Sequence, residues 1–544
     1  MKTHHSLLSL AVAAGLVLSA LPADAADTTK ASAKTRAQAL VKQSGNAATL
    51  RRASADAFSA GDVVIDANGT EHVRFQRSFD GLPVIGGDFV VHSKDGKLQG
   101  VSQTLATTSR PGLKPKIASD KAIVEAGARF GSQFAGSPTS RLVVYARGAT
   151  PVLAHEVVFN GTKADQTPTE MHYIVDAGTG KVLDQWDMIH TAQPGPGGGT
   201  ACTGTAATGT GKSLASGAVK IGTTKCGNEY VLTDMARGGG STHNMAMKTG
   251  GMGTVFTDPD NTWGTGLVTH AQTAAVDAHY GVAMTWDYYK NKHGRLGILG
   301  DGVGVVARVH YGRNYGNAFW SDACQCMSFG DGTNGATILP LVALDIAAHE
   351  MTHGVTSHTA ALLYSGETGG LNEATSDIFG TMVEHYAGNA NDPADYVIGE
   401  ELYKNNDSMR SAVRWMFKPS LDGASPDCYS STVGQMDVHY SSGVANHLFY
   451  LLAEGAKVPS GFGAGTWANL TPASLVCNGN TKLTAIGRDA AANIWYRALT
   501  VYMTSTTSYS GARAATVSAA TDLYGASSTQ AKAVQAAWSA VGVN

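Results

Sequence analysis

Two histidines four residues apart constrain this chain more than any other feature of its sequence. His349 and His353 stand on either side of Glu350 in the run His-Glu-Met-Thr-His. On a helix, residues i and i+4 lie on one face, so both imidazoles could bind one metal ion. Glu350 could then reach a water molecule at that metal. Because residues 341–348 are mostly apolar, the sequence predicts a buried helix; two unrelated core or surface histidines are the alternative.

A third ligand should follow this helix. Asn372 and Glu373 stand where an apolar segment begins, and we expect them to open the next helix. Glu373 and Asp377 lie four residues apart and would share one face of that helix. Glu373 would complete a site of two histidines and one glutamate with an open position for water. Asp377 would accept the second ring N–H of His349. By spacing alone, Glu367 or Glu384 could replace Glu373.

A Gly-rich run separates two unlike parts of the chain. Residues 194–199 read Pro-Gly-Pro-Gly-Gly-Gly, and a Gly/Thr/Ala-rich stretch continues to residue 211. Residues 26–190 hold 19 basic and 16 acidic residues and no cysteine, whereas residues 191–544 hold 20 basic and 26 acidic residues and all six cysteines. This contrast predicts a pro-segment joined by a cleavable linker to a mature protein. An ordinary linker between domains is the alternative.

The first of these parts has the pattern of an α+β unit. Alternation of apolar and polar residues predicts strands, and Asp-Gly pairs predict the turns between them. We expect strands at 72–79, 84–92, 141–146, 154–158 and 172–175, and a helix near 119–130. No cluster with catalytic spacing occurs here, so the chemistry is expected in the second part.

The N-terminus has the three parts of a secretory signal. Lys2 supplies the positive charge, residues 7–21 are apolar, and Ala23-Asp24-Ala25 provides the small residues for cleavage before Ala26. This apolar run is shorter than the roughly 20 residues needed to span a membrane. We therefore expect a secreted, extracellular protein; a buried helix or a membrane anchor is the alternative.

Six cysteines in an exported chain predict disulfides, with a cysteine-rich zinc site as the alternative. The cysteine spacing includes no C-x2-C pair, which favours disulfides. We predict sequential pairing of Cys202 with Cys226, Cys324 with Cys326, and Cys428 with Cys477.

Charge and hydropathy argue against two classes of partner. The formal net charge is −3 and no basic run occurs, which argues against nucleic acid. Mean hydropathy is −0.08, and the one long apolar stretch is the N-terminal one, which argues against a membrane protein. Hydrophobic residues make up 43% of the chain, enough for a large core.

Several segments together resemble one family. His-Glu-x-x-His followed by Asn-Glu-x-x-Ser-Asp-Ile-Phe-Gly-Thr is similar to the thermolysin family of zinc endopeptidases, in its elastase-like bacterial form. The likeness covers nearly all of residues 200–544. Phe-Asp-Gly-Leu-Pro-Val at 79–84 resembles that family's propeptide. Further matching segments are 277–280, 286–290, 317–320 and 437–443.

The resemblance implies an α+β fold with two lobes. The N-terminal lobe would be β-rich, the C-terminal lobe helical, and the zinc helix would form the floor of the cleft between them. An α+β propeptide would precede the enzyme. The expected divisions are a signal peptide at 1–25, a propeptide at 26–190 with an FTP-type part at about 60–110 and a PepSY-type part at 115–190, a linker or mature N-terminus at 191–211, and lobes at 212–345 and 346–544.

The same resemblance implies roles for individual residues. One catalytic zinc would be bound by His349, His353 and Glu373, and Glu350 would act on the zinc-bound water and pass its proton to the leaving amine. The remaining implied roles are oxyanion hydrogen bonds from His439 and Tyr364, orientation of His439 by Asp437, peptide binding along an edge strand by Asn317 and Ala318, and a grip on a substrate carbonyl by Arg410.

Six apolar residues match the family's specificity pocket. Their middling size predicts cleavage on the N-terminal side of Leu, Phe or a similar bulky apolar residue. The six are Ile338, Leu341, Ile346, Ile398, Leu402 and Met409.

Residues 371–403 hold seven acidic residues and no Lys or Arg. So many carboxylates without basic partners suggest that this segment binds a hard cation through oxygen ligands. Four residues match the family's structural calcium site, which holds one or two ions. These four are Asp345, Glu384, Asp395 and Glu400.

The resulting hypothesis is a secreted zinc endopeptidase made as a zymogen. Its partners would be protein and peptide substrates and its own propeptide, acting as folding aid and inhibitor; we expect a monomer, cut near residues 190–191. One rival is a non-peptidase zinc hydrolase or an aminopeptidase, although the chain has no GxMEN motif for a free amine. Another is a catalytically dead binding protein, against which Glu350 and His439 argue.

Overall fold

The computed structural model describes residues 23–131, 133–188, 202, 204–333, 335–404 and 409–544. The expected signal peptide lies outside these residues except for its last three, and so does the expected cut near residue 190. No helix within the described ranges is long and apolar enough to cross a membrane. We call residues 23–188 the N-terminal region and residues 204–544 the C-terminal region.

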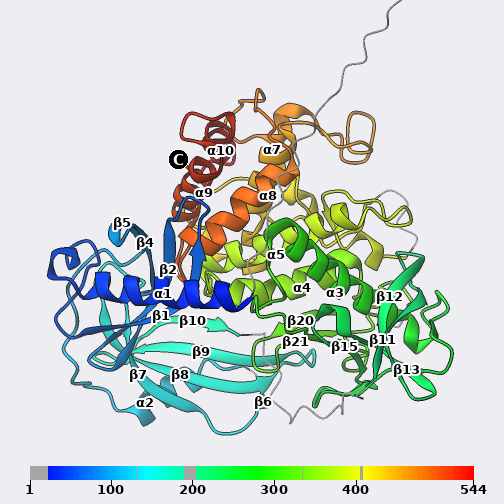
Figure 1. Ribbon diagram of the computed structural model, residues 1–544, viewed down its shortest axis with the longest axis horizontal. Coiled ribbons are helices and arrows are strands. Elements are labelled where there is room, and N and C mark those ends of the chain that lie inside the picture. Colours follow the sequence, from blue (N-terminus) through cyan, green and yellow to red (C-terminus); the bar gives the residue numbers. More distant parts are fainter. Residues whose placement is uncertain (1–22, 132, 189–201, 203, 334, 405–408) are drawn as a thin grey trace, which may run out of the picture.

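The N-terminal region is built on one ten-stranded sheet (Figure 1). Two antiparallel halves join where β3 runs parallel to β7, and each half carries one helix. Ala33 and Ala37 of the first helix pack on Phe75, while Ala122 of the second packs on Phe159. The elements are α1 Ala23–Lys42, β1 Asp56–Ile65, β2 Glu71–Phe79, β3 Leu82–Ile85, β4 Phe89–Lys94, β5 Lys97–Gln103, α2 Ser119–Gly127, β6 Gln133–Phe134, β7 Thr139–Tyr145, β8 Val152–Thr162, β9 Pro168–Asp176 and β10 Val182–Asp187.

The single strand predicted over residues 84–92 is wrong. β3 ends at Ile85 and β4 begins at Phe89. Gly86 adopts a positive φ of 77°, which favours glycine, and a Cβ on Gly87 would lie 2.6 Å from a Val84 side-chain carbon. The two glycines therefore turn the chain where alternation alone predicts a continuous strand.

The first half of the C-terminal region is rich in strands. Among the described residues, β20 lies at the edge of its six-stranded sheet and pairs antiparallel with β21 alone, as an edge strand for a peptide requires. A five-stranded sheet and the long helix α3 complete this half. The elements are β11 Thr205–Lys212, β12 Ala218–Cys226, β13 Glu229–Val231, β14 Thr233–Asp234, β15 Gly240–Asn244, β16 Thr254–Val255, β17 Thr257–Asp258, β18 Thr262–Trp263, α3 Ala271–His293, β19 Val306–Val309, β20 Ala318–Ser321 and β21 Cys326–Phe329.

The second half is mainly helical and shares one continuous core with the first. α4 lies between α3 and α5, and a Cβ on Gly281 would come within 2.5 Å of Ala347, so α3 and α4 pack closely. The elements are α4 Leu344–Ser357, α5 Gly366–Ala387, β22 Val397–Ile398, η3 Glu400–Leu402, β23 Arg414–Trp415, α6 Val438–Ser441, α7 Gly443–Glu454, α8 Arg488–Arg497, η7 Ala498–Tyr502, α9 Tyr509–Tyr524 and α10 Thr529–Ala540. The division expected at residue 345 falls inside α4, so the two halves share this helix.

The six cysteines form three disulfides in the sequential pattern expected from the sequence. Their Cα–Cα distances are 6.0 Å for Cys202–Cys226, 5.2 Å for Cys324–Cys326 and 5.9 Å for Cys428–Cys477. The Cys202 disulfide fastens the chain just before the C-terminal region to β12. The Cys428 link fastens two long connections between helices.

Candidate metal centre and active site

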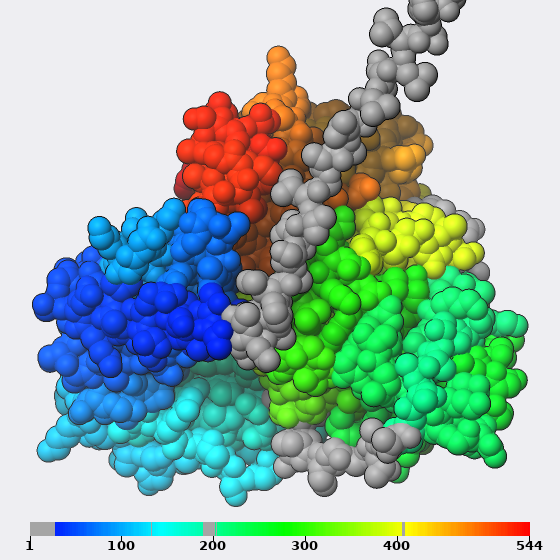
Figure 2. All heavy atoms as spheres, in the orientation of Figure 1, coloured from blue at the N-terminus to red at the C-terminus, as the bar shows by residue number. Residues whose placement is uncertain are grey.

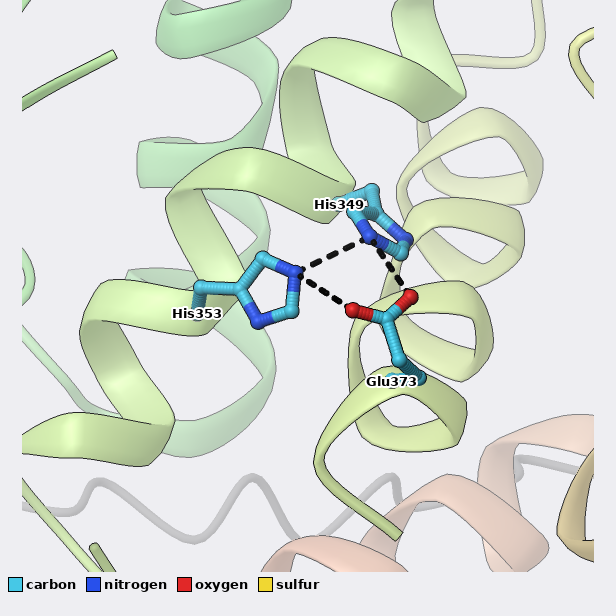
Figure 3. Close-up of side chains that lie close together, drawn as sticks. All are labelled: His349, His353 and Glu373. Carbon is cyan, nitrogen blue, oxygen red and sulfur yellow. Dashed lines mark hydrogen bonds and ion pairs between the residues drawn. The ribbon is translucent and has the colours of Figure 1, made fainter. Parts of the chain in front are cut away.

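His349 and His353 lie on one face of α4, and Glu373 of α5 faces them (Figure 3). The two Nε2 atoms are 3.0 Å apart. Glu373 Oε1 lies 3.4 Å from His353 Nε2, and Glu373 Oε2 lies 3.5 Å from His349 Nε2. These ion-pair distances exceed the usual N–H···O length of about 2.9 Å. The three side chains thus converge on one point without forming close hydrogen bonds between carboxylate and rings, which suits a shared metal ion.

Of the three glutamates that could supply the third ligand, Glu373 is the one that lies beside the histidines. Glu367 and Glu384 lie elsewhere. Glu367 accepts hydrogen bonds from the Tyr429 hydroxyl at 2.9 Å and the Tyr509 N–H at 2.8 Å. The expectation that Glu373 opens its helix is wrong, because α5 begins seven residues earlier at Gly366. Glu373 is therefore held in a buried and fully formed part of the helix.

The second ring nitrogen of each histidine is also fixed. His349 Nδ1 lies 2.9 Å from Asp377 Oδ1, as predicted, and His353 Nδ1 lies 2.8 Å from Asn372 Oδ1. Asp377 also accepts two hydrogen bonds of 2.6 Å from Arg414. Burial opposes ionisation, but Arg414 and His349 outweigh it and lower the pKa of Asp377 to about 2. The ionised carboxylate therefore orients both the metal-facing ring and the guanidinium.

Glu350, Tyr364 and His439 meet the metal centre at one cavity of about 120 Å³. The Tyr364 hydroxyl donates to Glu373 Oε1 and lies 3.2 Å from His439 Nε2. His439 Nδ1 lies 2.7 Å from Asp437 Oδ1, as predicted. Glu350 is buried, and burial raises its pKa to about 7. A carboxyl of this kind is suited to taking up and releasing a proton near neutral pH.

Two of the three predicted peptide-binding residues lie at the same cavity. Asn317 and Ala318 line the cavity at the start of β20. Arg410 lies outside the cavity, in an adjoining groove, with its guanidinium 5.9 Å from the ring of Trp467. Arg414, four residues further along, lines the cavity itself. Arg414 could not be predicted from the sequence, because its position depends on Asp377, which is distant in the chain.

Half of the predicted specificity pocket is found at the cavity. Leu341, Ile346 and Leu402 line it, and so does Val413, which the sequence analysis did not name. The other three lie elsewhere: Ile338 bridges to Tyr403, Ile398 is buried in β22, and the Met409 carbonyl accepts from Trp415 Nε1.

A second cluster of acids lies beside α4 and α5. Carboxylate oxygens of Asp345, Glu384 and Glu401 lie within 4.8 Å of one another, and those of Glu384, Asp395 and Glu400 form an overlapping group. Both oxygens of Glu384 are buried with no hydrogen-bond partner among the described residues. Burial raises the pKa of Asp345 to about 7 and that of Asp395 to about 6. Glu401 was not among the predicted ligands.

Comparison with known families agrees with this geometry. Residues 208–357 match the model of the thermolysin metallopeptidase catalytic domain, and residues 360–543 match that of its alpha-helical domain. The chain belongs to the thermolysin metallopeptidase family. Residues 56–105 match the fungalysin/thermolysin propeptide motif. The chain is thus a metalloprotease that carries the propeptide motif of the thermolysin family. Below, the name propeptide is used for residues 26–188, the described part of the pro-segment that the sequence predicts.

Known proteases can be aligned with most of the chain. A transglutaminase-activating metalloprotease of Streptomyces mobaraensis is 48% identical over 89% of this chain, which spans only 60% of that relative. The thermolysin of Alicyclobacillus acidocaldarius subsp. acidocaldarius is 38% identical over 88% of this chain and 84% of its own length. The precursor of protealysin, a metalloproteinase from Serratia proteamaculans, aligns over 56% of this chain and 87% of its own, with 26% identity and a TM-score of 0.43.

Proposed function

We propose that this chain is a secreted zinc endopeptidase that hydrolyses peptide bonds on the N-terminal side of bulky apolar residues. The observation that supports it best is the meeting of three metal-ligand side chains with Glu350, Tyr364 and His439 at one cavity beside a free strand edge. A binding protein without catalysis would have no need of this set.

Zinc fits the residues that converge here. Two imidazoles and one carboxylate, with the cavity on their open side, are the donor set of catalytic zinc sites. A zinc ion held by His349, His353 and Glu373 would act as a Lewis acid and make a water molecule nucleophilic near neutral pH.

The chain's own groups would then carry the proton and the charge. Glu350 would accept a proton from the attacking water and deliver it to the leaving amine. Tyr364 and His439 would donate hydrogen bonds to the oxygen of the scissile carbonyl as it gains negative charge. The substrate would lie along β20 as an added strand, with Arg414 positioned to bind one of its carbonyls.

Casein hydrolysis by the matured protein tests this function. Activity should be abolished by 1,10-phenanthroline and return when zinc is added in excess of the chelator. Hydrolysis that continues unchanged in the chelator would rule out the proposed chemistry.

Substrate preference follows from the cavity wall. Leu341, Ile346, Leu402 and Val413 offer an apolar surface, so burial of a Leu or Phe side chain should contribute about 1.5–3 kcal/mol to binding. Cleavage of denatured casein should therefore occur mostly on the N-terminal side of Leu, Phe and similar residues. Peptide mapping by mass spectrometry checks this, and dominant cuts beside Lys or Asp would contradict it.

We also propose that the second acidic cluster binds one or two structural calcium ions. The support is geometric: three buried and two partly buried carboxylates gather beside α4, from Asp345, Glu384, Glu400, Asp395 and Glu401. Buried carboxylates normally have cationic or hydrogen-bonding partners, and groups of oxygen ligands without Lys or Arg suit calcium.

Residues 26–190 are further proposed to act as a folding aid and inhibitor that is removed after export of a monomeric enzyme. Figure 2 shows the N-terminal region packed along one side of the C-terminal region. Arg497 forms two hydrogen bonds of 2.6 and 2.7 Å to Asp66. Asp88 accepts from the Ser505 N–H at 2.9 Å, and Arg74 donates to the Met503 carbonyl at 2.9 Å. These bonds would hold the propeptide after the linker is cut.

The interface should weaken in acid because of His92. Its Nε2 contacts Ser102, and its ring lies 5.2 Å from that of Tyr502 in the C-terminal region. Burial and the neighbouring His72 lower the pKa of His92 to about 3. The complex thus requires neutral His92, and it loses stability as pH falls from about 6.5 toward 3. The other charged or titratable groups around this ring are His72, Asp66, Arg74, Arg497, Tyr502 and Asp522.

Gel filtration of the cleaved protein at a series of pH values measures this loss. We expect the propeptide to co-elute with the enzyme at pH 7 and to separate increasingly below pH 6. His92→Gln should reduce the change with pH. Identical co-elution of the wild type at pH 7 and pH 4.5 would contradict the prediction.

A further inference from the structure

The propeptide contacts the candidate active site at residues 363–365, a turn that leads into α5. Leu363 packs into an apolar cluster whose other members all belong to the N-terminal region, including Val143, Ile174 and Trp186. Its N–H donates to the Ser505 carbonyl at 2.9 Å. An apolar side chain of the enzyme is thus partly buried against the propeptide sheet.

Arg147 of the propeptide holds the other end of this turn. Its guanidinium donates to the Ser365 hydroxyl and, at 3.3 Å, to the Ser365 carbonyl. A third bond of 3.4 Å reaches the Thr368 hydroxyl in the first turn of α5. Asp184 fixes the guanidinium from behind at 2.7 Å, and both charged side chains are mostly buried. Hydrogen bonds from a charged group in such a setting are stronger than those between neutral groups.

Tyr364 stands between these two anchors. Its side chain points to the metal centre, where the hydroxyl donates to Glu373 and lies 3.2 Å from His439 Nε2. The propeptide thus contacts the residues on both sides of Tyr364, whose hydroxyl lies at the metal centre.

We propose that the turn at residues 363–365 is the docking surface through which the cleaved propeptide stays bound and inhibits the enzyme. This inference rests on the proposed peptidase function. It assigns inhibition of the peptidase to Arg147 and to the apolar cluster of the propeptide that contacts Leu363. The partner of this turn is therefore the propeptide sheet, which offers an apolar cluster and, beside it, a mostly buried guanidinium.

Arg147→Ala in the full-length chain tests the proposal. Arg147 belongs to the part that is removed, so the matured enzyme is chemically identical to the wild type. After the linker is cut, peptidase activity is measured at increasing dilution, and the activity regained gives the dissociation constant of the propeptide. We expect Arg147→Ala to raise that constant by roughly tenfold or more. At high dilution, both proteins should reach the same specific activity.

Arg36→Ala is the matched control, because Arg36 forms its ion pair with Glu71 inside the propeptide. It should leave the dissociation constant unchanged. If Arg147→Ala does not fold, Arg147→Lys keeps the charge without the forked geometry and should also raise the constant. An Arg147 variant that binds as tightly as the wild type would overturn the proposal. A wild type that gains no activity at any dilution would instead refute the peptidase function.

Discussion

Replacing Glu350 by glutamine should lower kcat/KM for peptide hydrolysis by about 10²–10⁴-fold, the usual contribution of a general base. Glu350 lines the cavity beside His349 and His353, and burial raises its pKa to about 7. Glutamine keeps the size and the hydrogen-bonding oxygen but cannot take up a proton. The loss should therefore appear mainly in kcat.

Two measurements separate this chemical effect from damage to the fold. The zinc content and the melting temperature of Glu350→Gln should match those of the wild type, because Glu350 is not one of the three ligands. Glu229→Gln, at an exposed position in β13, serves as the control for the substitution itself. Full activity of Glu350→Gln would remove Glu350 from the mechanism.

Chelation of calcium should lower the melting temperature of the matured enzyme by roughly 10 °C, with zinc retained. An ion at about 1,000 times its dissociation constant stabilises the folded state by about 4 kcal/mol. For a domain of this size, 1 kcal/mol corresponds to about 2–4 °C. Without the ion, the carboxylates of Asp345 and Glu384 face one another in the interior. Calorimetry with a calcium-selective chelator checks this.

Glu384 provides the sharpest variant for the calcium prediction. It belongs to both overlapping groups of carboxylates, so Glu384→Gln should weaken every ion bound there. The variant should melt at a lower temperature in calcium and should respond less to the chelator. Glu229→Gln should behave like the wild type. A wild-type melting temperature that is the same with and without calcium would contradict the assignment.

The sequence predicted the parts of the site that depend on helical spacing. His349 and His353 share a face because they are one helical turn apart, and Glu373 and Asp377 follow the same rule on α5. The edge position of Ala318 and the orientation of His439 by Asp437 also agree with the expectations. These features are local in the sequence, or they lie in segments that resemble the family's motifs.

The features that the sequence did not predict depend on contacts between residues far apart in the chain or on the backbone conformation of single residues. Arg414, rather than Arg410, lines the cavity because Asp377 holds its guanidinium across 37 residues of sequence. Val413 likewise gains its place from the loop before β23, and Glu401 from the short helix η3. The strand predicted over 84–92 is broken by two glycines whose conformations alternation does not reveal. Side-chain pattern alone contains none of this information.

Zinc content per chain, measured by mass spectrometry of metals in matched variants, tests the central claim most directly. The account predicts one zinc per chain in the wild type and in Glu350→Gln, and strong loss of zinc in His353→Ala and Glu373→Gln. A His353→Ala protein that is folded and retains one tightly bound zinc at this site would contradict it. So would a folded wild type that binds no zinc.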